Sequence, residues 1–331
     1  MSAAARVTTE LVSIGETMAL LTSPQVGRLR DRRSLDLSTA GAESNVAIGV
    51  RRLGYRAAWV GRVGADELGE KILADLRGEG IDVSAAVVDR GAATGLMLKE
   101  RRMANVLRVS YYRKGFAGSR LEPADVPPAL IAGARIVHVT GISLGLSASA
   151  AATVGHAIDL ARSAGALVSF DFNYRSGLWT PEEAAPRLRE TARRADLIFG
   201  GEDELALVAD KSEAARGTEA EIALAVAEKL SDGGSRRVVI KRGRQGARTV
   251  GPDGIVDVPA FTVAEIDPVG AGDAFVAGYL AGELDGLDVH ACLRLGCAAG
   301  GFVVMQMGDW EGLPSRTDLS LMDHDFGTIF R

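Results

Sequence analysis

Six short, continuously apolar runs constrain the fold of this chain more than any other feature of its sequence. Each stops at a glycine, aspartate or asparagine, and they read LVSIGE (11–16), AAWVGRVG (57–64), RIVHVTG (135–141), ALVSFDFN (166–173), DLIFGG (196–201) and RRVVIKRG (236–243). Strands that are buried on both faces need such unbroken hydrophobicity. Helix-like segments separate the runs, at residues 43–54, 66–80, 147–165, 181–195 and 218–234. This alternation predicts an α/β fold in which helices flank a doubly wound, mostly parallel sheet.

Polar side chains gather where the predicted strands end. They are Glu16, Asp171, Asn173, Glu202, Glu204, Lys241 and Arg242. In open parallel sheets, ligands bind at the carboxyl ends of the strands. We therefore expect the chemistry of the protein at this edge of the sheet.

Residues 18–40 and 93–114 interrupt the alternation of strand and helix. Each segment has the pattern of two strands with a turn between them, at residues 25–27 and 103–105. Both leave the predicted core near the carboxyl edge of the sheet, so together they predict a small β-sheet lid. The alternative is a pair of ordinary surface loops, although long loops without secondary structure are uncommon in compact domains.

The length of 331 residues suits one large α/β domain with a small accessory one. We assign residues 10–17, 41–92 and 115–320 to the core. The terminal residues 1–9 and 321–331 are expected to be flexible tails.

Charge and targeting signals argue against nucleic-acid and membrane partners. The 38 lysines and arginines and the 43 aspartates and glutamates give a net charge of -5, so no overall field attracts polyanions. The N-terminus lacks the apolar segment of a signal peptide, and no run of about 18 apolar residues is present. The two cysteines, Cys292 and Cys297, are too few for a disulfide framework and lack zinc-site spacing. These features predict a soluble protein of the cytoplasm.

The segment DPVGAGDAF (267–275) precedes a helix that is rich in small residues. Glycine is costly inside a regular element, so Gly270 and Gly272 at a helix start suggest a backbone that approaches an anionic or bulky group. The amides of Gly270, Ala271 and Gly272 would converge at the helix N-terminus, where a phosphate is favoured. Asp273 would then be placed to take a proton from a hydroxyl, as phosphoryl transfer requires. The alternative is a tight turn with an aspartate that complements the helix dipole.

Several ordered motifs between residues 11 and 314 resemble the ribokinase-like, or PfkB-type, carbohydrate kinases. DPVGAGDAF resembles the C-terminal signature of this family, with Pro268 where threonine is usual. AGAESNVAIGVRRLG (40–54) resembles its N-terminal signature, and GRVGADELGEKI (61–72) the segment that follows it. The resemblance implies a ribokinase-like fold with a lid, ATP and Mg²⁺ as cofactors, and phosphorylation of a sugar hydroxyl. It leaves activation by K⁺ open.

Motifs on the substrate side are similar to those of the 2-keto-3-deoxygluconate kinases within this family. They are ESN (43–45), YYRKGFAGSRL (111–121), HVTGISLGLS (138–147), DFNYRSGLW (171–179) and GDWEGLP (308–314). This resemblance implies transfer of the γ-phosphoryl group of ATP to the primary hydroxyl of 2-keto-3-deoxygluconate, which gives the 6-phosphate. The small-molecule partners would be this sugar acid and ATP.

The same resemblance assigns sugar-binding residues by position. Gly41 and Asn45 would hold sugar hydroxyls, and Tyr111 and Arg113 would reach across the sugar from a lid strand. Arg175 would pair with the carboxylate of the substrate, a geometry that suits a guanidinium group. Without the resemblance, Arg175 would be interpreted as a surface arginine and Tyr111 as an aromatic residue of the lid core.

The resemblance also assigns catalytic and nucleotide-binding residues. Asp273 would deprotonate the attacking hydroxyl, and the amides of Gly270, Ala271 and Gly272 would stabilise the transferred group. The segment KRGRQGA (241–247) resembles the family's triphosphate-binding turn, although a glycine-rich turn between two strands explains it equally well. The nucleotide-binding candidates are Lys241, Gly243, Gly246, Gly270, Gly272 and Cys297.

Four further positions depart from the family pattern. Glu204 matches the glutamate of an Asn-x-x-Glu motif that organises Mg²⁺ through water, but Gly201 stands at the asparagine position. Ala40 replaces the first glycine of the hinge between lid and core. Met97 stands where many relatives carry a lid tyrosine, and Cys297 where relatives often place asparagine beside the adenine.

The sequence leaves rival functions open. A fructokinase, or a kinase for another ketose or for 5-keto-2-deoxygluconate, is kept open by Ala40 and Met97. A nucleoside kinase fits the cationic YYRK and NYR segments less well. A non-catalytic sugar-acid sensor has no use for an intact Asp273, and a dinucleotide oxidoreductase needs a G-x-G-x-x-G turn where this chain reads GETMALL. Family resemblance also implies a homodimer formed through the lid, since a four-stranded lid buries little core alone.

Overall fold

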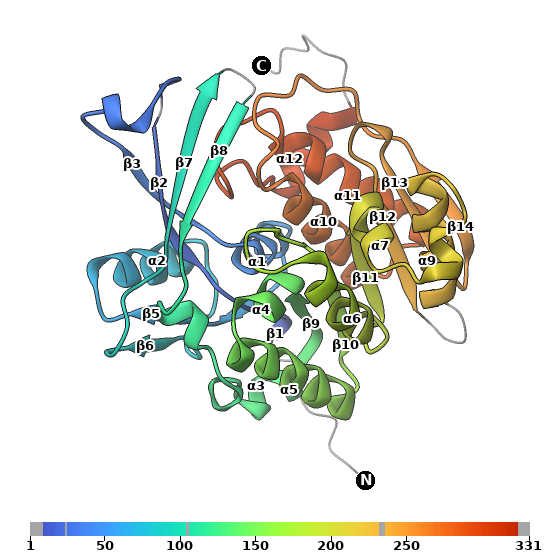
Figure 1. The fold of residues 1–331 in the computed structure, drawn as a ribbon, viewed down its shortest axis with the longest axis horizontal. Helices are drawn as coiled ribbons and strands as arrows, with labels where there is room; N and C mark the ends of the chain where they lie inside the picture. The colour runs from blue at the N-terminus through green and yellow to red at the C-terminus, as the bar shows by residue number, and fades with distance from the viewer. Residues whose placement is uncertain (1–8, 24, 104–105, 232–235, 324–331) are drawn as a thin grey trace.

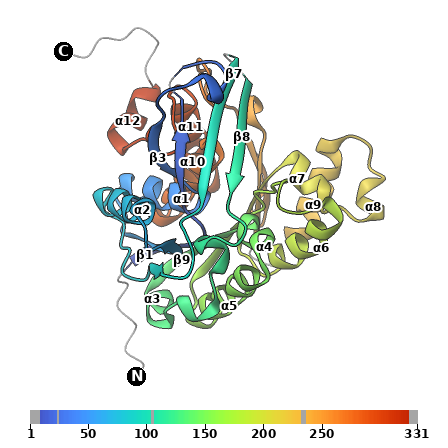
Figure 2. The ribbon, with the colours of Figure 1, turned by 60° about the vertical axis from the view of Figure 1, so that its left-hand side comes forward.

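The computed structural model describes residues 9–23, 25–103, 106–231 and 236–323. Within them, a large α/β core carries a smaller sheet that projects from its side (Figure 1). Figure 2 shows the smaller sheet from another side, where its strands stand apart from the helices at the opposite end of the core.

Eight strands form the main sheet, in the order β14-β13-β12-β11-β10-β9-β1-β4. Six of them are parallel: β1 (Thr9–Ile14), β4 (Ala57–Val60), β9 (Ala134–Thr140), β10 (Leu167–Asp171), β11 (Leu197–Gly201) and β12 (Arg237–Lys241). Every apolar run in the sequence overlaps one of these strands, so the predicted α/β fold is confirmed. The antiparallel strands β13 (Ala247–Gly251) and β14 (Gly254–Val258) complete one edge.

Helices cover both faces of the main sheet, as a doubly wound fold requires. One face carries α1 (Ala42–Arg52), α2 (Glu67–Gly78), α10 (Ala271–Asp285), α11 (Val289–Val303) and α12 (Arg316–Ser320). The other carries α3 (Pro128–Ala132), α4 (Gly141–Leu146), α5 (Ala148–Ala164), α6 (Pro181–Ala192), α7 (Glu202–Leu207) and α9 (Glu219–Ser231), with α8 (Lys211–Ala214) beside α9. In the part of the chain that the structure describes, each helix is too short or too polar to span a membrane.

Each face of the main sheet has its own hydrophobic core. Leu11 and Trp59 pack into the core under α1 and α10, whereas their neighbours Val12 and Ala58 pack into the core under α5. Successive side chains of a strand point to opposite faces, so both must be apolar when both faces are covered. This is the physical reason for the continuous apolar runs.

A second sheet, which we call the lid, has the strand order β3-β2-β7-β8. Its strands are β2 (Met18–Thr22), β3 (Asp36–Ala40), β7 (Leu96–Met103) and β8 (Val106–Tyr112). Met18, Leu20, Ala40 and Met97 form a small buried cluster on its inner face, with Val109 packed against them. The lid predicted from residues 18–40 and 93–114 is therefore present as a separate sheet.

The structure corrects several boundaries that the sequence predicted. Run 57–64 is two strands, because the chain leaves the main sheet at Gly61 and continues as β5 (Arg62–Gly64), which pairs with β6 (Val87–Asp89). A side chain at Gly61 would collide with the Gly15 carbonyl and with Trp59.

Regular structure also extends into both predicted tails. Thr9 already pairs with Ala134, and a 3₁₀ turn spans Leu321–Asp323. The rest of both tails, residues 1–8 and 324–331, and most of the predicted turn at 103–105 lie outside the described residues. The turn at 25–27 belongs to a longer connection that includes a 3₁₀ helix at Leu29–Asp31.

Candidate active site

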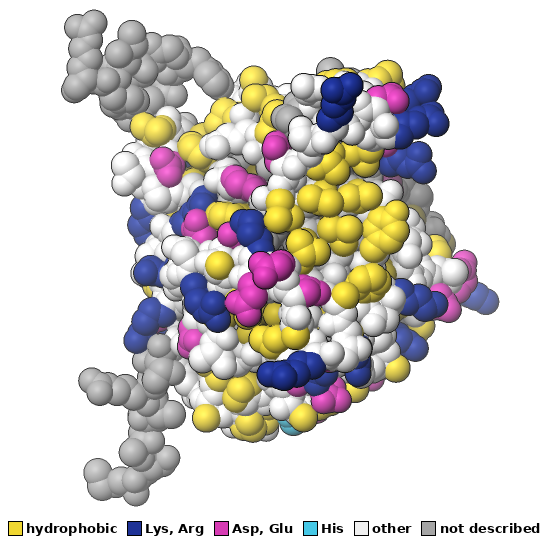
Figure 3. Space-filling view, turned by 90° about the vertical axis from the view of Figure 1, so that its left-hand side faces the viewer, with side chains coloured by type: hydrophobic (Ala, Val, Ile, Leu, Met, Phe, Trp, Pro, Cys, Tyr) yellow, Lys and Arg dark blue, Asp and Glu magenta, His cyan; other side chains and the backbone are white. Residues whose placement is uncertain are grey.

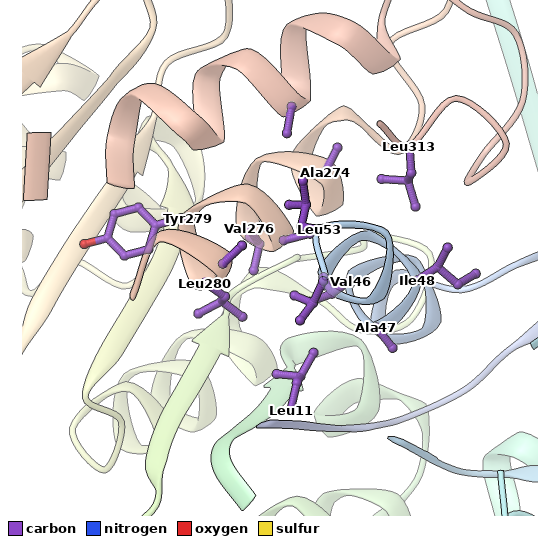
Figure 4. Close-up of a cluster of buried hydrophobic side chains, with 14 of the residues drawn as sticks. Leu11, Val46, Ala47, Ile48, Leu53, Ala274, Val276, Tyr279, Leu280 and Leu313 are labelled. Carbon is purple, nitrogen blue, oxygen red and sulfur yellow. The ribbon is translucent and has the colours of Figure 1, made fainter. Parts of the chain in front are cut away.

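Helices α1 and α10 cross so closely that their backbones almost touch. A Cβ atom added to Gly49 would lie 2.5 Å from Cβ of Ala277. Around this crossing, Val46, Ile48 and Leu280 belong to the buried cluster that Figure 4 shows. Small residues in both helices therefore permit the close approach. It holds together the two helix starts, each of which carries a predicted site residue.

Asn45 on α1 and Asp273 on α10 are joined by a hydrogen bond. The Asn45 side-chain amide donates to Oδ2 of Asp273 at 2.9 Å and to Oδ2 of Asp309 at 3.2 Å. Burial, and after it the Asp309 carboxylate, raise the pKa of Asp273 to about 7. Burial also raises the pKa of Asp309 to about 6, although the Asn45 hydrogen bond opposes the rise. The site thus contains two buried carboxyl groups that change charge near neutral pH.

The first turn of α10 has the backbone that the glycine-rich segment predicts. Gly270 caps the helix in a left-handed conformation, with φ of 80°, and a Cβ atom there would collide with the Asp309 carbonyl. Only glycine fits both demands. The Ala271 amide donates to the Pro268 carbonyl at 3.3 Å. This contact corrects the prediction of three free amides, and leaves those of Gly270 and Gly272 as the candidates from that set.

A cavity of about 90 Å³ lies against this turn, between the core and the lid. All five predicted sugar-binding residues line it, together with Gly270 and Asp273. The five are Gly41, Asn45, Tyr111, Arg113 and Arg175. Two positions that depart from the family pattern, Ala40 and Met97, line the same cavity. Residues that are far apart in sequence therefore converge where the resemblance implied.

Two arginines in this cavity have different surroundings. Arg113 is buried and forms an ion pair with Glu16, in which its Nε donates to Oε2 at 2.7 Å. Its guanidinium group also lies over the Tyr111 ring, 5.3 Å from the centroid. Arg175 is exposed and donates to the Tyr174 carbonyl, and among the described residues no carboxylate forms an ion pair with it. Arg175 is therefore the cation that is available to a ligand carboxylate.

Glu16 and Glu43 give the bottom of this cavity a buried acidic character. Oε1 of Glu43 accepts hydrogen bonds from Thr140 at 2.7 Å and from Ser143 at 3.0 Å. Burial raises the pKa of Glu43 and of Glu16, and in Glu16 it outweighs the opposing effect of Arg113. Glu43 thereby fastens the start of α1 to the end of β9 and to α4.

A larger cavity of about 450 Å³ lies on the other side of the α10 turn. It contains five of the six predicted nucleotide-binding residues, Lys241, Gly243, Gly246, Gly272 and Cys297, together with Ala271, whereas the sixth, Gly270, lines the smaller cavity. Its other walls include the apolar side chains Phe261, Val263, Phe275 and Val304. Burial raises the pKa of the Cys297 thiol to about 11, so the thiol is neutral. An elongated ligand with an apolar part and an anionic part matches this lining.

The two cavities share one wall, residues 269–273. Val269, Gly270 and Asp273 line the smaller cavity, and Ala271 and Gly272 line the larger one. A group that passes between the cavities must therefore pass the N-terminus of α10.

Lys241 joins the larger cavity to two acidic side chains. Its Nζ donates to both carboxylate oxygens of Asp171 at 2.8 Å. Burial alone would lower the pKa of Lys241, but Asp171 and Glu204 outweigh it and raise the pKa. Oε1 of Glu204 accepts from the Tyr174 amide at 2.7 Å and Oε2 from the Gly201 amide at 2.8 Å. The described residues contain no cluster of three or more metal-binding side chains, so the indirect metal role of Glu204 stays a prediction.

Sequence reasoning overlooked three contributors to the site. Asp309 lies in the quoted motif GDWEGLP, which was the available signal. The only signal for Glu16 is its place at the end of a predicted strand. Lys99 had no signal, because its partner Asp267 is 168 positions away in the chain.

The fold and the two cavities agree with a comparison of whole sequences. A sequence model described as pfkB family carbohydrate kinase matches residues 8–316. The chain belongs to this family. As a pfkB-family member it is a carbohydrate kinase, so the predicted family and enzyme class are confirmed.

The similar proteins cover nearly the whole of this pfkB-family chain. The 2-dehydro-3-deoxygluconokinase of Thermoproteus tenax is 39% identical over 92% of this chain and 91% of its own. That of Bacillus subtilis (strain 168) is 36% identical over 94% of each chain. The crystal structure of a PfkB protein from Polaromonas sp. JS666 has a TM-score of 0.82 and 35% identity, and the match covers 95% of this chain and 99% of that one.

Proposed function

We propose that this protein transfers the γ-phosphoryl group of ATP to the primary hydroxyl of 2-keto-3-deoxygluconate and forms the 6-phosphate. One observation carries the proposal: the α10 turn separates a small polar cavity that contains Asp273 from a large cavity that suits a nucleotide. The names of the relatives from Thermoproteus tenax and Bacillus subtilis support the choice of sugar.

Asp273 is the general base in this proposal. A carboxylate whose pKa lies near 7 is ionised in about half of the molecules at neutral pH and still binds a proton readily. It takes the proton of the sugar hydroxyl as the oxygen attacks phosphorus, and ADP leaves. The Asn45 amide orients the carboxylate, and the amides of Gly270 and Gly272 stabilise charge on the transferred group.

Arg175 selects a substrate that carries a carboxylate. Its guanidinium group lines the cavity and has no ion-pair partner among the described residues, so a ligand carboxylate gains a charge-assisted pair there. Arg113 already has an ion-pair partner in Glu16, so it is less available than Arg175 to a ligand carboxylate. We assign it a fixed place beside Tyr111, where both can donate to sugar oxygens. Gly41 would bring backbone up to the sugar, because it lines the cavity and a side chain there would collide with the Glu16 carbonyl.

The larger cavity would bind ATP, with Lys241, Gly243 and Gly246 near the phosphates and Cys297 beside the base. Asp171 and Glu204 are oxygen donors of the type that Mg²⁺ prefers, and both interact with Lys241, which lines this cavity. Mg²⁺ supplies neutralisation of phosphate charge when bound. Activation by K⁺ is left open, and replacement of K⁺ by choline in the assay would test it. The cytoplasm is the proposed location.

A substrate panel tests the proposed function. ADP release should be fastest with 2-keto-3-deoxygluconate, and slower with 2-keto-3-deoxygalactonate, fructose, ribose and adenosine. Faster turnover of fructose would establish the fructokinase alternative instead. Saturable binding of the sugar acid by calorimetry, without any sugar-dependent ADP release, would establish the sensor.

We also propose that the outer face of the lid binds a second copy of this chain. Figure 3 shows hydrophobic side chains gathered on the side of the molecule that carries the lid. On alternating positions of its strands, the outer face presents Leu21, Leu37, Leu96, Leu98 and Tyr112, all exposed or half-buried. A sheet with apolar side chains on both faces is stabilised when its outer face is also covered. Light scattering should give a dimer mass, and Leu98→Asp should give a monomer, whereas Leu287→Asp, an exposed site on the core, should not.

A further inference from the structure

Lys99 is a lid residue whose charged end is buried inside the core. It lies on β7 with Met97 and Arg101, whose side chains share the inner face of the lid. Its side chain is only 5% exposed, and its Nζ donates to Oδ2 of Asp267 at 2.7 Å and to the Gly308 carbonyl at 2.8 Å. An ammonium group in such a place is bound firmly, because both it and its partner have lost their water.

The first partner of Lys99 belongs to the loop that enters α10. Asp267 is almost fully buried, and its other carboxylate oxygen accepts the Val269 amide at 3.2 Å. Gly270 follows at the next position. Arg101, from the same strand of the lid, lies 3.3 Å from Oδ2 of Asp267. The ion pair therefore reaches the α10 turn through one short stretch of backbone.

The second partner belongs to the loop that carries Asp309. Gly308 precedes Asp309, whose carboxylate binds Asn45 and whose carbonyl packs against Gly270. Another lid strand holds the same loop, because Trp310 Nε1 donates to Thr39 Oγ1 at 3.0 Å. Lys99 thus binds, with one ammonium group, the two loops that place both buried carboxyl groups of the site.

We propose that Lys99 is a positioning residue for phosphoryl transfer, which holds the 267–270 loop and the 308–309 loop in the spacing that the reaction needs. It touches neither cavity, so it acts through these loops and through its charge, which lowers the pKa of Asp309. The kinetic part of this inference rests on the proposed function. A consequence is that the site is complete only while β7 stays against the core.

Three variants test the role of Lys99. In Lys99→Met the side chain keeps its length and loses its charge, and in Lys99→Arg it keeps the charge. As a control, Arg108→Met removes an exposed arginine from the adjacent strand β8. We expect Lys99→Met to lower kcat by roughly 10²-fold, since a displacement of about 1 Å can cost that much. The KM for ATP should stay near that of the wild type. Lys99→Arg should recover part of kcat, and Arg108→Met should match the wild type.

Hydrogen exchange gives a second readout that needs no activity. In Lys99→Met, amides of residues 266–273 and 306–310 should exchange faster, while those of β9 and β10 keep their wild-type rates. Normal kcat or unchanged exchange in both loops would overturn the inference. Faster exchange throughout the core would also overturn it, because Lys99 would then be a general stabiliser. If wild-type protein phosphorylates no sugar, the proposed function fails, and the exchange rates still decide whether Lys99 holds the loops.

Discussion

The two cavities on either side of the α10 turn differ in how their walls are built. The smaller one is lined by charged and amide side chains that are buried and bound to one another, such as Asn45 with Asp273 and Arg113 with Glu16. The larger one consists mainly of glycine backbone and apolar side chains. A wall of interlocked polar groups recognises one ligand closely, whereas an apolar wall tolerates change. Substitutions on the two sides should therefore have very different effects.

The largest effect should come from Asp273→Asn. Loss of the general base should lower kcat by roughly 10²–10⁴-fold. The KM for ATP should change little, because Asp273 lines only the smaller cavity. Steady-state kinetics with the sugar and ATP varied separately would show this, and near wild-type turnover would disprove the assignment of the base.

The same variant should be more stable than the wild type at pH 8. The pKa of Asp273 is raised from 3.8 to about 7 in the folded protein, so its contribution to stability is present below pH 4 and is lost as the pH rises through 7. Replacement by asparagine removes that cost, which is on the order of 1–4 kcal/mol. Thermal unfolding at pH 8 measures the gain, and excludes unfolding as the cause of lost activity.

Arg175→Met should have the next largest effect, and only for the sugar. A hydrogen bond to a charged group contributes about 1.5–3 kcal/mol, so the KM for the sugar acid should rise by roughly 10- to 100-fold. Arg175→Lys should retain part of the affinity, and the KM for ATP should be unchanged. An equal rise for both substrates would show that the two cavities are not independent.

The pH dependence of kcat/KM should report the ionisation of Asp273 in the smaller cavity. Since Asp273 must be ionised, kcat/KM should fall by roughly tenfold per pH unit below about pH 7. The Asp309 carboxylate raises the pKa of Asp273, so Asp309→Asn should shift the acidic limb of the pH profile to lower pH. A limb that stays in place would mean that the two carboxyl groups do not interact.

Cys297→Ser should have the smallest effect. The thiol is buried and neutral in an apolar part of the larger cavity, and serine is nearly the same size. We expect the KM for ATP to change by less than about threefold, because serine can still make the contact, so only a small part of the about 0.5–1.5 kcal/mol of one uncharged hydrogen bond is lost. A tenfold rise in the KM for ATP would show that the larger cavity is as sensitive to substitution as the smaller one.

The sequence predicted the fold well because continuous apolar runs have one physical explanation, a sheet covered on both faces. It also identified residues such as Asn45 and Asp273, since motifs record which backbone positions face the site. It did not predict that Arg113 is paired with Glu16, or that Lys99 reaches Asp267. Such pairings depend on how the lid sits on the core, and no local pattern of residues encodes the distance between two separate sheets.

The contact between Gly49 and Ala277 limits which variants of this protein can survive selection. Neither residue lines a cavity, yet a larger side chain at either would push Asn45 away from Asp273. In a survey of all single substitutions, these two positions should tolerate as little as Asp273, the proposed general base, although they line neither of the two cavities. At such positions, intolerance to mutation reflects the required spacing of two helices and not the presence of a reactive group.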